Sequence, residues 1–297
     1  MEENNMIRTR RPVSDMMFVP MLLSVALMLL GQLIGMLPLV FTMMTSTSPA
    51  EITATQYISF WGIWAVVCLY MLLVKKNRPI FSALGRRAAG NNWKGFLLGL
   101  LFGFGLNGFC ILIAWLHKDI YLTFDSFRPV SFVLVFLCVF VQSSAEELLC
   151  RGFLYQRLRK GYRSPLVAIL GNSALFAALH LFNEGVTVLS VINIFVVGVF
   201  FSLMVYYMDS IWCAMAAHTA WNFCQNIIFG LPNSGIVVPY SVFKLDASTA
   251  MDSFAYNVGF GIEGTILADA VLILATVLLW LWGRKYGKKP LDVWHTL

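Results

Sequence analysis

The stretch Ser143-Ser144-Ala145-Glu146-Glu147-Leu148-Leu149-Cys150-Arg151 places two adjacent carboxylates and one arginine at the end of a long apolar run. A charge at bilayer depth costs roughly 2.5 to 3.5 kcal/mol on insertion scales, so three together require a reason. On a helix, Glu147 and Arg151 share one face and can pair, whereas Glu146 points about 100° away. We expect Glu147 and Arg151 to brace each other and Glu146 to face a polar cavity, where it could act as a base. A purely structural ion pair with one solvated carboxylate is the alternative.

The composition is that of a polytopic membrane protein. The chain has 297 residues, of which 59% are hydrophobic and 12% are charged, against about 25% charged in an average soluble domain. Most of its apolar runs reach the roughly 17 to 25 residues that span the hydrocarbon core of a bilayer. We predict an all-α helical bundle in the membrane with about eight transmembrane helices, at Phe18–Met44, Ile58–Val74, Phe96–Leu116, Ser131–Ala145, Pro165–Phe182, Val186–Met208, Ile211–Leu231 and Gly264–Trp282.

The basic residues predict the orientation, because cytoplasmic loops of membrane proteins carry an excess of Lys and Arg. With the N-terminus inside, 17 of the 21 Lys and Arg residues fall in segments on the cytoplasmic side. We therefore expect an integral membrane protein, in the cell membrane if the source is bacterial, with both termini in the cytoplasm. The net charge of +6 then reflects this topology and the anionic head groups of the lipid bilayer. It gives no support for nucleic-acid binding.

Four segments follow from these runs, and no internal repeat or soluble domain interrupts them. We expect a cytoplasmic arm at residues 1–17, three transmembrane helices with loops at 18–130, a core of four transmembrane helices at 131–231, and an outer loop, the last transmembrane helix and a basic cytoplasmic tail at 232–297.

Two histidines lie in the core segment, at the end of Phe176-Ala177-Ala178-Leu179-His180 and at the start of His218-Thr219-Ala220-Trp221-Asn222. His180 and Glu146 are each 17 residues from Arg163, so they would sit at the same level of an antiparallel helical hairpin. A lone intramembrane histidine is usually a helix-packing group. Two of them at the level of a glutamate favour a polar site.

The residues after His180 interrupt the apolar pattern. Asn183 and Glu184 follow it by three and four positions, so we expect them to rim the cavity, and we expect Phe176 to line it as well. At a depth of about 12 Å for His180, the helix would end inside the membrane and the 183–185 turn would be buried there. Such a broken segment is tolerated only where it lines protein or a watery cavity.

The ordered motifs resemble those of the CAAX prenyl protease and bacteriocin-processing family (CPBP, or Abi) of intramembrane peptidases. EExxxR, FxxxH and HxxxN stand here as Glu146 to Arg151, Phe176 to His180 and His218 to Asn222. Each motif is weak alone, but the ordered set on successive spans is specific. The resemblance covers about residues 131–231, which makes that segment the expected catalytic core.

The resemblance implies a role for each matching residue. Glu146 and His180 would activate a water molecule, and His218 and Asn222 would stabilise the oxyanion. Glu147 and Arg151 would hold the site together. Peptide hydrolysis needs a base for water, donors for the oxyanion and a proton for the leaving amine, and these side chains can supply all three. No Ser or Cys stands in an obvious pairing with a base, so activated water is the better hypothesis.

Whether a metal assists stays open. Glu146, His180 and His218 could hold zinc with an open position for water. The alternative is a metal-free glutamate peptidase, which we slightly favour, and the sequence has no helix-borne HExxH. The family that the chain resembles has been described both ways.

We expect an intramembrane endopeptidase that cuts a membrane-associated or prenylated peptide or protein near the cytoplasmic face. Two other classes remain. A non-catalytic membrane scaffold or bacteriocin-immunity protein of the same fold would not need the complete motif set. A proton- or ion-coupled transporter could use intramembrane Glu and His as relay groups, but the chain lacks the inverted repeats of many transporters.

Overall fold

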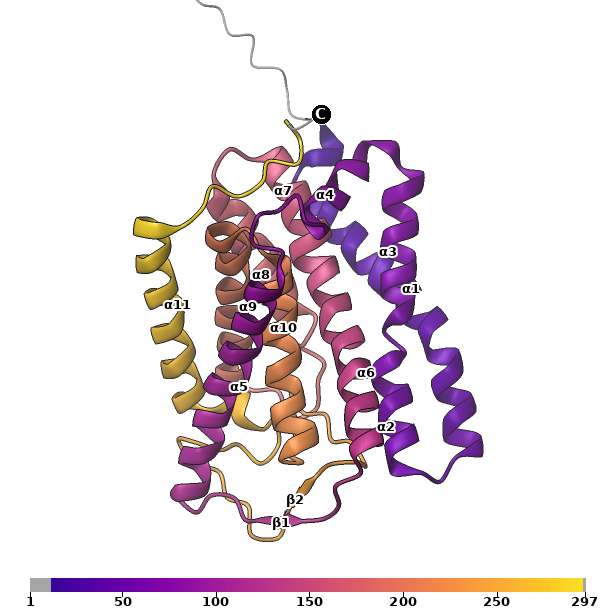
Figure 1. The fold of residues 1–297 in the computed structure, drawn as a ribbon, viewed down its shortest axis with the longest axis vertical. Helices are drawn as coiled ribbons and strands as arrows, with labels where there is room; N and C mark the ends of the chain where they lie inside the picture. The colour runs from indigo at the N-terminus through magenta and orange to yellow at the C-terminus, as the bar shows by residue number, and fades with distance from the viewer. Residues whose placement is uncertain (1–11, 296–297) are drawn as a thin grey trace, which may run out of the picture.

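The computed structural model describes residues 12–295, so most of the arm that we predict at residues 1–17 lies outside the described residues. Figure 1 shows a bundle of long helices that run from one end of the molecule to the other, along its longest axis. The C-terminus lies at the same end as α7 (Tyr155–Gly161), and the antiparallel pair of β1 (Leu122–Phe124) and β2 (Phe243–Leu245) lies at the opposite end (Figure 1).

The first part of the described chain holds three candidate membrane spans within residues 18–130. These are α1 (Phe18–Thr45), the consecutive helices α2 (Pro49–Ile58) and α3 (Trp61–Leu73), and α5 (Trp93–Leu116). A short turn, η1 (Val13–Asp15), precedes α1, and η2 (Lys75–Ile80) and α4 (Phe81–Leu84) connect α3 to α5.

The glutamate motif lies on one long helical segment, Pro129–Gly161, which continues beyond the predicted span Ser131–Ala145. This segment begins as α6 (Pro129–Glu147), passes through a π-helical stretch η3 (Leu148–Leu154) and ends as α7. A turn then leads to α8 (Pro165–Ala178), in which Pro165 occupies the first turn, where its missing N–H leaves no hydrogen bond unmade.

A tight connection joins the next two helices, α9 (Val188–Met208) and α10 (Ile211–Asn222). Asp209 ends α9 in the left-handed conformation, with φ of 52°. Ser210 then caps α10, because its side chain accepts a hydrogen bond from the backbone N–H of Cys213 at 3.1 Å. A second π-helical stretch, η4 (Phe223–Ile228), continues α10. The short η5 (Ile262–Gly264) and the last helix, α11 (Ile266–Tyr286), complete the described chain.

The predicted count of about eight transmembrane helices is not confirmed. Among residues 12–295, six helical segments are long and apolar enough to cross a membrane. The two apolar runs without such a segment form α8, of 14 residues, and α10, of 12 residues, which η4 extends. At 1.5 Å per residue, α8 is about 21 Å long, less than the roughly 30 Å of a hydrocarbon core.

Glycines bring α5 against α10, the helix that carries the HxxxN motif. A Cβ atom at Gly99 would lie 2.2 Å from the carbonyl oxygen of Cys213, and one at Gly103 would lie 2.2 Å from that of Ala217. Such a small-xxx-small pattern lets two helix backbones approach closely. Asn107, one turn further along α5, donates to Gln225 at 2.7 Å. These contacts fix α10, and therefore His218, inside the bundle.

Candidate active site

One cavity of about 270 Å³ collects the polar residues of all three motifs. Glu146 reaches it from the end of α6, His180 from just beyond α8, and His218 and Asn222 from α10. These four residues are the ones to which the resemblance assigns catalytic roles. Phe176 and Asn183 also line the cavity.

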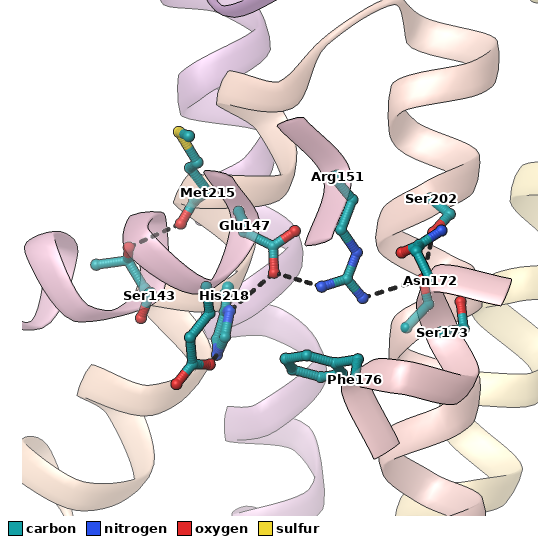
Figure 2. Close-up of polar contacts among 12 residues, drawn as sticks. Ser143, Glu147, Arg151, Asn172, Ser173, Phe176, Ser202, Met215 and His218 are labelled. Carbon is teal, nitrogen blue, oxygen red and sulfur yellow. Dashed lines mark hydrogen bonds and ion pairs between the residues drawn. The ribbon is translucent and has the colours of Figure 1, made fainter. Parts of the chain in front are cut away.

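Glu147 links two of the motifs (Figure 2). Its Oε1 atom accepts a hydrogen bond from Nη1 of Arg151 at 2.9 Å, and another from Nδ1 of His218 at 3.0 Å. The side chains of Glu147 and Arg151 are both 0% exposed. The predicted brace therefore exists, but it also holds the histidine of another helix, which the sequence did not indicate.

The ring of His218 is oriented by that contact. Because a carboxylate oxygen only accepts hydrogen bonds, Nδ1 of His218 must carry a proton and donate it in the hydrogen bond to Glu147. The other ring nitrogen, Nε2, then lies on the cavity side, 3.6 Å from Oε2 of Glu146. Phe201 stacks on the same ring with its centroid 5.4 Å away. The imidazole therefore presents Nε2 to the cavity in a fixed orientation.

His180 is oriented by its own helix. Its Nδ1 lies 2.8 Å from the backbone carbonyl oxygen of Phe176. A carbonyl oxygen only accepts, so this nitrogen is the donor, and in the neutral imidazole Nε2 carries a free lone pair. His180 lines the cavity, so it can take a proton from a molecule bound there.

Phe176, the first residue of the FxxxH motif, packs against three residues of the site. Its ring meets that of His180 edge-on at 4.8 Å and that of His218 at 5.9 Å. The guanidinium of Arg151 lies over its face, 4.4 Å from the centroid, where a cation–π interaction is favourable. Arg151 also donates to the carbonyl oxygen of Gly198 on α9 at 3.2 Å. One aromatic ring thus sets the spacing between both histidines and the buried cation.

Asn222 is joined to the turn that precedes Glu146. Its Nδ2 donates to Oε1 of Gln142 at 3.0 Å and lies 3.3 Å from Oγ of Ser143. The amide of Gln142 in turn donates to Oε1 of Glu146 at 2.8 Å. One glutamine side chain therefore binds both residues: its N–H₂ group donates to the carboxylate of Glu146, and its carbonyl oxygen accepts from the carboxamide of Asn222.

The structure places Glu184 outside the cavity. Its side chain is exposed and does not belong to the cavity wall, so the prediction that it rims the cavity is wrong. Gly185 is exposed too, whereas Asn183 is half-buried and donates to the carbonyl oxygen of Ser234 at 2.9 Å. The backbone of the turn packs closely against the outer loop: a Cβ atom at Gly235 would lie 2.1 Å from the carbonyl oxygen of Glu184, and one at Gly185 would lie 2.5 Å from that of Gly259.

Among the cavity residues that were missed from the sequence are Gln142, Asn233 and Glu263. Gln142 precedes Glu146 by four positions, so helical spacing could have found it. Asn233 and Glu263 lie in the 232–297 segment, in which we expected only an outer loop, one helix and a tail. No local pattern brings these loop residues to the cavity.

Both π-helical stretches begin within a few residues of the site. One starts directly after Glu147 and the other directly after Asn222. Such i→i+5 stretches occur mostly as short insertions in α-helices and often mark functional sites.

The residues present do not fit a metal centre as they are arranged. Among residues 12–295, no group of three His, Cys, Asp or Glu side chains is placed to hold a metal ion. The predicted zinc ligands Glu146, His180 and His218 share the cavity without forming such a group. The chemistry is therefore derived from the side chains alone.

Residues 128–224 match the family model described as type II CAAX prenyl endopeptidase Rce1-like. This stretch is about a third of the chain and contains all three motifs, which confirms the resemblance that they indicate. The match supports a membrane peptidase with a membrane-associated substrate. No curated protein sequence matches the chain.

Proposed function

From the Rce1-like match over residues 128–224, we propose that this chain is an intramembrane endopeptidase that hydrolyses a peptide bond with water activated by glutamate and histidine. One observation carries the proposal: Glu146, His180, His218 and Asn222 come from three separate parts of the chain and line the same cavity. A packing role for each residue separately would not require them to share one space.

Water activation falls to Glu146 and His180. Glu146 presents Oε2 to the cavity while Gln142 holds Oε1, and the side chain of Glu146 is 19% exposed. The lone pair on Nε2 of His180 can accept a second hydrogen bond from the same water. A base within hydrogen-bond reach of the proton typically contributes about 10²- to 10⁴-fold in rate. The proton that Glu146 takes from water is then available for the leaving amine.

Oxyanion stabilisation falls to His218 and Asn222. Both can aim an N–H group at the developing negative charge, His218 through Nε2 when both its nitrogens are protonated and Asn222 through Nδ2. Glu147 behind His218 favours a proton on Nδ1. Donors held in place before the reaction are worth more than mobile ones, because no reorganisation is needed as charge develops.

The substrate is a membrane-associated or prenylated peptide or protein. Apolar side chains of α1 and α3, among them Met28 and Ile63, line the same cavity as the polar groups. A wall of this kind suits a substrate that carries apolar side chains or a lipid group into the bundle.

The cytoplasmic side is the end of the bundle that carries the C-terminus and α7 (Figure 1). The basic residues of the 284–289 and 157–163 segments gather there, as expected of cytoplasmic segments. On this reading both termini are inside, and α8 and α10 with η4 are two further, shorter crossings that bring the total to eight.

The test compares wild type with Glu146→Ala, each purified in detergent, on a library of membrane-anchored and prenylated peptides analysed by mass spectrometry. We expect wild type to cleave one class of peptide and Glu146→Ala, folded to the same extent, to cleave none. If neither cleaves while the folded protein still confers a cellular phenotype, the scaffold or bacteriocin-immunity function replaces the peptidase.

A further inference from the structure

Glu263 is a cavity residue that the proposed reaction does not use. It lies in η5, ahead of α11, and outside the stretch that matches the Rce1-like family. Its side chain lines the same cavity as Glu146 and is only 5% exposed. A buried carboxylate is costly unless its oxygens are hydrogen-bonded, so its partners indicate what it does there.

Four N–H groups point at this carboxylate. Oε1 accepts from Nδ2 of Asn233 at 2.8 Å and from Nε1 of Trp221 at 3.0 Å. Oε2 accepts from Nε2 of Gln225 at 2.7 Å and from the backbone N–H of Ser234 at 3.3 Å. The indole and the backbone N–H can only donate, and an ionised carboxylate can only accept, so the Glu263 carboxylate accepts from all four partners.

Asn233 connects Glu263 to Asn222 and determines which end of the Asn222 carboxamide faces it. Its Nδ2 atom bears two protons, and the second of these points to Oδ1 of Asn222 at 3.3 Å. Because Glu263 requires the N–H₂ end of Asn233, that end also faces Asn222. The carbonyl oxygen of Asn222 is therefore drawn towards Asn233, and its own N–H₂ group is turned towards Gln142.

The orientation of Asn222 matters because the two ends of a carboxamide have nearly the same shape. Only its hydrogen-bond partners distinguish them. With the nitrogen on the Glu146 side, Asn222 can donate to an oxyanion formed there. With the oxygen on that side, it would repel the same charge.

We propose that Glu263 is a positioning residue that acts through Asn233 to orient the carboxamide of Asn222, so that its N–H₂ group faces the reaction. This inference rests on the proposed function, since it assigns Asn222 to the oxyanion. Glu263 itself does not touch the substrate in this account.

The experiment measures kcat and KM separately for the full chain in detergent, on a peptide that the wild type cleaves. The variants are Glu263→Gln, Asn233→Leu and the double variant. A side-chain amide at position 263 offers both a donor and an acceptor, so it no longer dictates which end of Asn233 faces it. We expect Glu263→Gln to lower kcat about tenfold with little change in KM, less than the 10²- to 10³-fold loss on removing an oxyanion donor outright.

A purely structural role would not give the expected pattern in the double variant. If Glu263 acts through Asn233, Glu263→Gln lowers kcat no further once Asn233 is replaced by Leu, so the two effects are not additive. Asp269→Asn is the matched control, because Asp269 is another buried carboxylate with an asparagine partner, Asn193, at 2.9 Å. It does not contact Asn222, and we expect its kcat to equal that of wild type.

Each outcome decides a different claim. Cleavage by wild type with an unchanged kcat in Glu263→Gln overturns the positioning role alone. Additive losses in the double variant overturn it as well. If Glu263→Gln does not fold, Asn233→Leu decides: a lower kcat at unchanged KM supports the role, and an unchanged kcat overturns it. No cleavage by folded wild type overturns the proposed function, and the positioning role falls with it.

Discussion

Nδ1 of His218 lies 3.0 Å from Oε1 of Glu147, and the same oxygen accepts a hydrogen bond from Nη1 of Arg151 at 2.9 Å. The second glutamate of the EExxxR motif is therefore bound both to the arginine of its own helix and to the histidine of α10 (Figure 2). The two adjacent glutamates therefore differ in position: Glu147 holds Arg151 and His218 in place, and Glu146 faces the cavity.

The first prediction concerns the contacts of Glu147 with Arg151 and His218. Glu147→Ala leaves the fully buried guanidinium of Arg151 without its carboxylate, and breaking a buried pair in this way costs about 3 to 5 kcal/mol. We expect a clear fall in Tm of the detergent-solubilised protein, together with loss of cleavage because His218 loses its acceptor.

The double variant Glu147→Leu/Arg151→Met separates the two effects. Removing both charges recovers most of the stability, since an apolar pair replaces the buried ions, but cleavage stays low because Nδ1 of His218 still has no acceptor. Full recovery of cleavage in the double variant would contradict the role of Glu147 at His218.

Phe176 gives the second prediction. Phe176→Leu keeps the apolar volume roughly constant, so we expect a stability loss below about 1.5 kcal/mol. It removes the ring that contacts both histidines and Arg151, so we expect kcat to fall by tenfold or more, measured on the same peptide substrate.

Phe200→Leu is the control for that variant. Phe200 is 2% exposed and packs against the rings of Phe102 and Phe201, but it does not line the cavity. We expect it to retain the kcat of wild type. Equal activity of the two variants would show that the position of the Phe176 ring does not matter for the reaction.

The third prediction concerns metals. Because the described residues gather no three ligating side chains, we expect cleavage to persist after dialysis against a strong chelator. The measurement is the initial rate before and after dialysis, with and without added zinc. Loss of activity that zinc alone restores would assign Glu146, His180 and His218 to a metal centre.

The fourth prediction tests the orientation. Ala247 lies in the exposed turn after β2, at the end of the bundle opposite the C-terminus, and Lys289 is exposed beyond α11 (Figure 1). In intact cells, a membrane-impermeant thiol reagent should label Ala247→Cys and leave Lys289→Cys unlabelled until the membrane is opened. Wild type gives the background, because its six cysteines are buried or half-buried. The reverse labelling pattern would invert the topology.

Much of the site could be predicted from the sequence because its motifs are local. The i,i+4 spacing of Glu147 and Arg151, and of His218 and Asn222, fixes which side chains share a helix face. The pattern Gly99-x-x-x-Gly103 is local in the same way, and it lets α5 approach α10 closely.

The remaining features depend on contacts between distant segments. Nothing near Glu263 or Asn233 in the sequence indicates that an outer loop enters the cavity and reaches Asn222. Counting apolar runs also overestimates the number of long spans. Hydropathy does not show that α8 ends after 14 residues, before its apolar run ends. The π-helical stretches carry no recognisable sequence signal either.

The central claim is that Glu146 activates the attacking water, and Glu146→Gln tests it most directly. The amide has nearly the same shape as the carboxylate but cannot take a proton at neutral pH. The measurement is the single-turnover cleavage rate of the folded variant relative to wild type. The account predicts a fall of about 10²-fold or more at unchanged Tm; a rate within a few-fold of wild type would contradict it.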